Sequence, residues 1–263
     1  MPPPAITELV RALADVFMPR YCIICGREVD HRTSADVCPT CEAQIALPRA
    51  GTCPKCCAAV PRFGGSCPNC HNMSLAMNES TAFGVYAGAL RDRIIEFKFS
   101  GARHLARTFG YLAARAVSET WPDVRFDAVS GVPLHATRFK QRGFDQAQGL
   151  AAYAARALGA RYRPGLIKRV RPTESQVGLT KSARIRNVKD AFTACRAEHV
   201  LTALVLDDIM TTGATMSAAC RALKRAGVKT VYAAVVARAA FAPEDAAADV
   251  PTEDRGGEHE DQP

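Results

Sequence analysis

The chain has 263 residues and a formal net charge of +8, with 48% hydrophobic and 23% charged residues. This is the balance of a globular protein, long enough for one domain of ordinary size and a smaller one. No apolar run approaches the roughly 18 residues that a membrane helix needs, so we expect no membrane span. The N-terminus lacks the features of a secretory signal, which predicts a cytoplasmic protein.

The charge is unevenly distributed along the chain. Residues 243–263 hold eight acidic residues and one arginine, in a composition rich in Ala, Pro and Gly that predicts a disordered acidic tail. The rest of the chain is therefore more basic than the total suggests. A basic body suits phosphate-rich ligands or nucleic acid, although a generally solvated basic surface would have the same composition.

The first predicted element is a short amphipathic helix at residues 5–17, which makes residues 1–19 a separate N-terminal helix. Apolar residues recur there at three- and four-residue spacing, and Pro19 ends the pattern. We expect this stripe to dock on the protein rather than on a membrane.

Four CxxC pairs follow within residues 20–75. They are Cys22/Cys25, Cys38/Cys41, Cys53/Cys56 and Cys67/Cys70. Each pair on a tight turn presents two sulfurs to one tetrahedral ion, so eight cysteines predict two zinc ions in a double zinc ribbon. The segment has few large apolar side chains and could hardly fold without metal, which makes the two ions structural.

Several alternatives stay open for these cysteines. The pairs could join in sequence order or interleave as a cross-brace, and an iron–sulfur cluster could replace zinc. One pair alone could be a redox motif, but four pairs in one short segment favour metal. Cys57 and His71 adjoin the pairs, and His71 could replace Cys70 as a ligand. Cys195 and Cys220 lie among apolar residues, which predicts that both are buried and inert.

Residues 80–242 are predicted as a larger domain in which strands and helices alternate, after a polar connector at 72–82. The expected elements are a strand at 82–87, helices at 89–99 and 104–119, a strand at 127–132, a helix at 144–158, and strands at 166–170, 200–206 and 229–237. We take 127–132 as the first strand of the main sheet and 229–237 as the strand that closes it. The alternation predicts an α/β fold: a parallel sheet flanked by helices, with a ligand crevice at the carboxyl ends of the strands.

Two segments between these elements carry candidate ligand-binding residues. Arg138, Lys140 and Arg142 lie between a strand and a helix, where three cations suit a pyrophosphate, although solvated loop charges need no such role. The polar segment 171–190, which includes Arg184, is longer than a plain connection requires. We expect it to be a mobile lid over the crevice.

The most informative stretch is residues 203–215. An apolar run at 203–206 predicts a strand buried on both faces, which stops at two carboxylates. A turn of small residues then leads to a helix at 216–225, ended by Gly227. Backbone N–H groups, the positive end of the helix dipole and hydroxyl groups meet in such a turn and form an anion site. The residues expected to hold a phosphate are Thr211, Thr212, Gly213, Ala214 and Thr215.

The two acids suggest the rest of the ligand. Carboxylates repel phosphate, so Asp207 and Asp208 would face neutral hydroxyl groups, and a ribose has two beside its 5′-phosphate. The simpler alternative is that these acids only cap the following helix.

Residues 205–215 resemble the phosphoribosyl-pyrophosphate (PRPP) loop of type I phosphoribosyltransferases. This resemblance implies that Asp207 and Asp208 hold the ribose 2′- and 3′-hydroxyls and that the loop holds the 5′-phosphate. In the purine-salvage members an aspartate that acts as the base precedes the Thr-Gly pair. This chain has Thr211 there, so the motif does not name a base or a nucleophile.

Short motifs along nearly the whole chain are similar to those of the ComF family. They are Tyr86-x-Gly88, Lys98-Phe99, Val132-Pro133-Leu134, Arg138, Arg142-Gly143-Phe144-Asp145-Gln146, Gln176-x-x-Leu179, Arg184-x-x-Asn187-Val188 and Ala191-Phe192. The resemblance implies a type I phosphoribosyltransferase-like sheet behind a double zinc ribbon. It also implies a link to natural transformation, incoming single-stranded DNA and DNA-uptake proteins. The family commonly has Asn where this chain has Asp145.

Three functions follow as hypotheses. The first is an enzyme that binds PRPP with Mg²⁺ and transfers its phosphoribosyl group, with Asp207, Asp208, Arg138 and Arg142 as catalytic candidates. Arg184 and the loop would bind the substrate. The second is a module that binds single-stranded DNA without chemistry, and the third is a PRPP sensor that signals through its ribbons. Because DNA lacks the 2′-hydroxyl, the acid pair favours a ribonucleotide-like ligand.

Overall fold

The computed structural model describes residues 19–30, 35–47, 51–60, 66–172, 181–188 and 190–239. The helix predicted at 5–17, the acidic tail, and Thr173 and Gln176 of the predicted lid lie outside these residues. Among the residues described, no helix is both long enough and apolar enough to cross a membrane.

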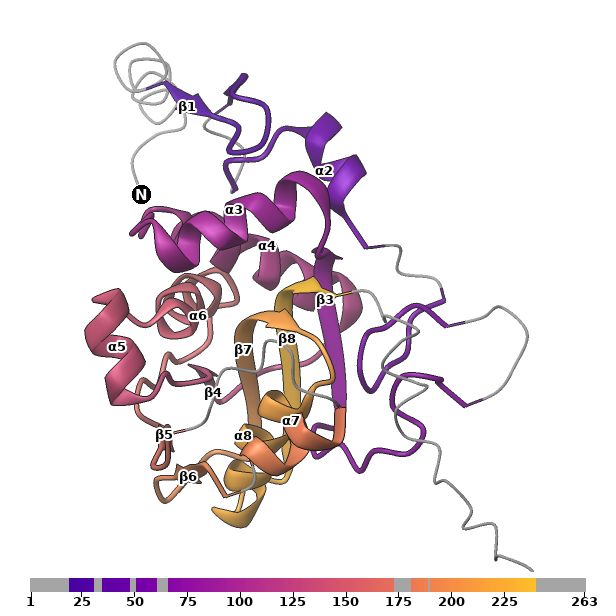
Figure 1. The fold of residues 1–263 in the computed structure, drawn as a ribbon, viewed down its shortest axis with the longest axis vertical. Helices are drawn as coiled ribbons and strands as arrows, with labels where there is room; N and C mark the ends of the chain where they lie inside the picture. The colour runs from indigo at the N-terminus through magenta and orange to yellow at the C-terminus, as the bar shows by residue number, and fades with distance from the viewer. Residues whose placement is uncertain are drawn as a thin grey trace, which may run out of the picture.

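A four-stranded sheet forms the centre of the fold, in the order β3-β8-β7-β4 (Figure 1). Its strands are β3 (Glu79–Val85), β4 (Ala128–Gly131), β7 (Thr202–Met210) and β8 (Thr230–Arg238). All three strand pairs are parallel. The two inner strands, β7 and β8, are almost wholly buried, as their apolar sequences require.

Helices cover both faces of this sheet. The helices α4 (Leu105–Thr120) and α6 (Gln146–Ala157) pack on one face, and α8 (Ala214–Arg225) packs on the other. Successive side chains of a strand point to opposite faces, so Leu204 and Leu206 join the cluster that contains α4 and α6, while Val205 joins the cluster that contains α8. The result is a three-layer α/β fold, which confirms the predicted fold class.

Two glycines allow the helices on the first face to lie close to their neighbours. A Cβ at Gly131 of β4 would lie 2.3 Å from the carbonyl of Ala147, at the start of α6. A Cβ at Gly110 of α4 would lie 2.6 Å from the carbonyl oxygen of Leu150. Real Cβ atoms do not approach other atoms this closely, so glycine at these positions sets how near the N-terminus of α6 lies to the end of β4.

The other elements surround this framework. They are β1 (Arg20–Tyr21), β2 (Glu28–Val29), α2 (Pro39–Ile45), α3 (Gly88–Phe99), α5 (Ala136–Arg142), β5 (Ile167–Arg169), α7 (Lys181–Val188) and β6 (Phe192–Ala194). The strands β5 and β6 form a separate antiparallel pair.

Residues 51–60 and 66–71 lie beside β3, the edge strand of the main sheet, whereas β1 and α2 lie beyond one end of β3 and next to α3 (Figure 1). The N–H of Leu47, after α2, donates to the carbonyl of Phe83 at 2.8 Å, and the N–H of Ser80 donates to the carbonyl of Pro54 at 2.7 Å. Both segments therefore use hydrogen-bonding groups that an edge strand would otherwise leave open to another chain.

The arrangement corrects several expectations. The strand β3 belongs to the main sheet, so 127–132 is not its first strand, and part of the supposed connector at 72–82 is β3 itself. The strand β8 lies between β3 and β7 instead of closing the sheet at an edge. Residues 136–142 form a helix, and the segment predicted as a lid contains α7. Local pattern predicts the type of the elements with strong apolar periodicity but carries little information on strand order.

Candidate functional site

A cavity of about 840 Å³ lies at the carboxyl ends of the strands, where parallel α/β sheets bind ligands. Nearly all the residues predicted for the ligand line it together. They are Asp207, Asp208, Thr211, Gly213, Ala214, Thr215, Arg138, Arg142 and Arg184. Lys98 and Arg169 line it as well. The cavity thus combines two carboxylates with five cationic side chains.

The two acids differ in their surroundings. Asp208 is 7% exposed and forms an ion pair with Lys98 of α3, whose Nζ lies 2.9 Å from Oδ1. Asp207 accepts a hydrogen bond from the N–H of Asp208 at 2.9 Å. Burial, together with the charge of Asp208, raises the pKa of Asp207 to about 8 against the opposing effect of Lys98. The raised pKa favours the protonated form of Asp207, whereas Asp208 is paired with Lys98. The strand continues to Met210, four residues beyond its predicted end at residue 206.

The loop of residues 211–215 joins β7 to α8 and is called the phosphate loop below, after the ligand that the sequence predicts for it. Gly213 has a φ of +80°, which favours glycine, and α8 begins at Ala214, two residues earlier than predicted. The side chain of Thr212 is buried and accepts a hydrogen bond from the N–H of Ala214 at 3.3 Å. Thr212 stabilises the loop through this internal hydrogen bond and is not among the described residues that line the cavity.

The short helix α5 presents two of its three cations to the cavity. Arg138 and Arg142 are one helical turn apart and both line it, whereas Lys140 is exposed on another face. Burial, with the nearby charge of Arg142, lowers the pKa of Arg138. The guanidinium of Arg142 also lies 5.1 Å from the ring centroid of Phe99, a residue that is 70% exposed at the cavity.

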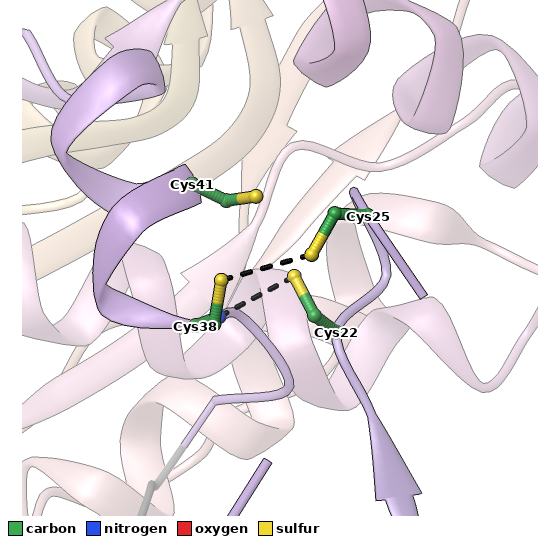
Figure 2. A group of neighbouring side chains, drawn as sticks. All are labelled: Cys22, Cys25, Cys38 and Cys41. Atoms are coloured by element: carbon green, nitrogen blue, oxygen red, sulfur yellow. Dashed lines mark hydrogen bonds between the residues drawn. The ribbon is translucent and has the colours of Figure 1, made fainter. Parts of the chain in front are cut away.

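The eight cysteines of the CxxC pairs form two groups, Cys22/Cys25/Cys38/Cys41 and Cys53/Cys56/Cys67/Cys70, in which all sulfurs lie within 4.8 Å of one another (Figure 2 shows the first group). The sulfurs therefore group in sequence order rather than as a cross-brace. Tetrahedral zinc with bonds of about 2.3 Å places its sulfurs roughly 3.8 Å apart. The observed separations are 3.8 Å for Cys25 and Cys38 and 3.7 Å for Cys53 and Cys70. Each group fits a zinc ion with no open position.

Polar groups around the second cluster also suit metal-bound thiolates. The side-chain amide of Asn69 donates to Sγ of Cys56 at 3.3 Å, and the N–H of Lys55 donates to Sγ of Cys53 at 3.4 Å. Such hydrogen bonds orient metal ligands and stabilise their charge.

His71 and the three cysteines outside the two clusters differ in burial and in surroundings. His71 is exposed and its Nδ1 lies 3.1 Å from the carbonyl of Cys67, so it does not replace Cys70. Cys57 and Cys220 are buried, and burial raises the pKa of each thiol to about 12, which makes both unreactive. The prediction for Cys195 was wrong because this residue is exposed. It follows the end of β6, where the alternation of buried residues stops.

Comparison with known proteins identifies the fold. The family model for the phosphoribosyl transferase domain matches residues 155–253. Competence protein F of Haemophilus influenzae is 28% identical over 225 residues, which cover 83% of this chain and 96% of that protein. Competence protein ComFC of Streptococcus pneumoniae is 27% identical over 194 residues, which cover 68% of this chain and 84% of that protein. These matches support the resemblance to the ComF family. DNA utilization protein YhgH of Salmonella typhi is also similar, at 28% identity over 220 residues, covering 76% of this chain and 95% of that protein.

The structure explains one departure from the ComF pattern. Asp145, where the family commonly has Asn, is the N-cap of α6 and accepts from the N–H of Gln148 at 3.0 Å through Oδ1. Its Oδ2 accepts from the N–H of Leu134 at 2.8 Å. Both carboxylate oxygens are used as acceptors, whereas asparagine has only one oxygen. Asp145 is not among the described residues that line the cavity, so its charge holds the 132–134 turn and not a ligand.

Two cavity residues were missed as site residues. Lys98 belongs to a ComF motif, but its pairing with Asp208 depends on how α3 lies against β7. Arg169 ends β5, and burial lowers its pKa. A cation at the end of a predicted strand was the available signal for Arg169, and the same signal had drawn attention to Arg138 and Arg142.

Proposed function

We propose that this protein binds PRPP as its magnesium complex and acts as a phosphoribosyltransferase. The phosphate loop would take the 5′-phosphate, Asp207 and Asp208 the ribose hydroxyls, and Arg138 and Arg142 the pyrophosphate. Arg184 would contact the ligand from α7. The observation that carries the proposal is the meeting of an acid pair, an amide-rich loop at a helix N-terminus and several arginines in one cavity.

The same arrangement suits the chemistry at C1 of the ribose. As the bond from C1 to pyrophosphate breaks, negative charge develops on the leaving group, and arginines already in position stabilise it without reorganisation. Mg²⁺ would neutralise part of that charge, and the oxygens that prefer it are those of PRPP and of the aspartates. Because Lys98 already pairs with Asp208, we expect the pyrophosphate oxygens to be the main ligands of the ion.

Substitution of Asp208 tests this proposal. We expect Asp208→Asn to weaken PRPP binding roughly 10–100-fold, which corresponds to one charge-assisted hydrogen bond. Isothermal titration with PRPP in excess Mg²⁺ measures the affinity. Removing a negative charge would by itself strengthen the binding of an anion, so a loss of affinity points to the hydrogen-bonding role.

The matched control is Asp92→Asn, which removes an exposed carboxylate from α3 and should leave the affinity within about twofold of that of the unchanged protein. An unaltered affinity in Asp208→Asn, or no binding by the unchanged protein, would contradict the proposal. Turnover of PRPP, measured with candidate bases as acceptors, then separates an enzyme from a PRPP sensor.

Binding of single-stranded DNA is a second proposed function, in keeping with the competence and DNA-utilization names of the relatives. The exposed ring of Phe99 beside Arg142, at the cavity, is the feature that favours it, because aromatic rings and cations together bind bases and backbone. Since DNA has no 2′-hydroxyl, we expect Asp208→Asn to leave DNA affinity unchanged. Equal losses for DNA and PRPP would mean that both ligands use the acid pair.

A further inference from the structure

Arg238 connects the second cysteine cluster to the strand that leads into the phosphate loop. It is the last residue of β8 and is 4% exposed. Its Nε donates to the carbonyl of Cys56 at 2.8 Å, and its Nη1 donates to the carbonyl of Met210 at 2.9 Å. Met210 is the last residue of β7, directly before the phosphate loop. One buried guanidinium therefore links a metal-ligand residue to the base of the proposed phosphate site.

A second set of contacts joins the segment after Cys70 to the phosphate loop and the first turn of α8. The N–H of Ala76 donates to Oγ of Ser217 in the first turns of α8 at 2.9 Å. The side chains of Leu75 and Met77 lie 3.7 Å and 3.6 Å from the position that a Cβ on Gly213 would take. The segment after Cys70 thus packs directly behind the phosphate loop, next to the N-terminus of α8.

The first cluster makes no comparable connection among the residues that the structure describes. Its segment is tied to α4 through Asp36, which forms ion pairs with Arg20 and Arg107 and accepts a hydrogen bond from Thr108 at 2.9 Å. None of these side chains lines the cavity. The two clusters therefore differ in what they support, although their ligands are the same.

We propose that Arg238 is a positioning residue through which the filled second zinc site sets the shape of the phosphate loop. The buried residues of this cluster are three of its cysteines and Ala58, and its further apolar neighbours among the described residues are Val60, Met73 and Leu75. We therefore expect bound metal to contribute much of what fixes the carbonyl of Cys56. If that carbonyl moves, the buried guanidinium loses a partner and its hold on Met210 changes. This inference rests on the proposed PRPP binding.

The coupling must act in both directions because binding free energies are linked. If zinc in the second site strengthens PRPP binding, PRPP must strengthen the retention of that zinc by the same factor. A purely structural role for Arg238 would lower stability without making zinc retention depend on the ligand. The equilibrium affinity for zinc, with and without PRPP, is therefore the informative measurement.

The main variant is Arg238→Met. Its control is Arg20→Met, which removes a partly buried, ion-paired arginine beside the first cluster. Zinc content is measured first, and PRPP affinity is then measured by titration in excess Mg²⁺. We expect Arg238→Met to bind PRPP roughly 10–100-fold more weakly, within the usual range of coupling between sites. Arg20→Met should stay within about twofold, and Arg238→Lys should recover part of the loss.

The second measurement is the equilibrium partition of zinc between the protein and a competing chelator, with and without PRPP, under the same excess of Mg²⁺. We expect PRPP to raise the zinc affinity of one of the two sites in the unchanged protein and in Arg20→Met, and to have no such effect in Arg238→Met. If Arg238→Met does not fold, Ser217→Ala, which removes a single hydrogen bond of the second set of contacts, takes its place with a smaller expected loss.

The outcomes separate the two proposals. The inference is overturned if the unchanged protein binds PRPP but Arg238→Met and Arg20→Met have equal PRPP affinities. It is also overturned if PRPP leaves the zinc affinity of every protein unchanged. Either result leaves the proposed function intact. Failure of the unchanged protein to bind PRPP overturns both.

Discussion

Asp207 and Asp208 are neighbours in one strand, but different charges act on them. Asp208 forms an ion pair with Lys98, whereas the like charges of Asp208 and Asp145 act on Asp207. Burial in a cavity wall adds to that repulsion and raises the pKa of Asp207 to about 8. The raised pKa favours a protonated Asp207, which is a weaker acceptor for a ribose hydroxyl than the ionised carboxylate.

This proton gives PRPP binding a pH dependence. If Asp207 accepts a hydrogen bond from a ribose hydroxyl, affinity should rise as the pH increases towards about 8 and level off above it. Titrations from about pH 6 to 9 would measure the rise, and Asp207→Asn, which has no proton to lose, should show a flatter profile. An identical slope in both proteins would contradict this assignment.

The carboxyl group of Asp207 should also make the stability of the ligand-free protein depend on pH, in the opposite direction to PRPP affinity. Its pKa in the folded state lies above the unfolded value of about 3.9, so the folded state holds the proton more tightly. The stabilising contribution is complete at low pH and is lost as the pH rises through about 8. Denaturant unfolding should therefore show stability falling between those values in the unchanged protein relative to Asp207→Asn.

At the scale of single residues, the sequence predicted what is local to one segment. The acids, the glycine and the threonines all lie within one strand–turn–helix unit, and the structure brings them to one cavity. Lys98 could not be assigned in the same way, because its role depends on a contact between two distant elements. Thr212 shows the finer limit: composition predicts a hydroxyl in the loop but not which side of the loop it occupies.

At the scale of elements, α5 determines which cations reach the cavity. A loop would have left Arg138, Lys140 and Arg142 equivalent, and a helix separates them because residues four apart share a face. The sequence hides this helix, since it has seven residues and none of them is buried. Without an apolar stripe, periodicity gives no signal.

Two substitutions in α5 test this separation, and each removes one positive charge from the same helix. We expect Arg142→Met to weaken PRPP binding roughly 10-fold or more, because one charge-assisted contact is lost. Binding of ribose 5-phosphate, which has no pyrophosphate, should change little. Lys140→Met should leave both affinities within about twofold. Equal effects of the two substitutions would indicate that only the total charge of the helix matters.

At the scale of the whole molecule, the two cysteine clusters meet the α/β domain at different places. Four CxxC pairs predicted which cysteines gather, and the structure groups them in sequence order, one of the two pairings that the sequence left open. What spacing could not predict is that the second cluster lies behind the phosphate loop. That contact depends on β8 inserting between β3 and β7, which brings Arg238 to Cys56.

Metal content tests the cluster assignment directly. We expect two zinc ions per chain by elemental analysis, and no visible absorption of the kind that an iron–sulfur cluster gives. Removing the metal with a chelator should unfold the segment of the second cluster, because its apolar contacts are few. One ion or none per chain would contradict the double ribbon.

The position of β8 also bears on how the chain is made. It is the last strand in chain order among the described residues, yet β3, the first strand of the sheet, pairs with it alone. Until β8 emerges from the ribosome, β3 has no strand partner and β7 has one open side. The nascent chain must therefore wait in a partly assembled form, and the cavity with its phosphate loop can be completed only after nearly all of the domain has been synthesised.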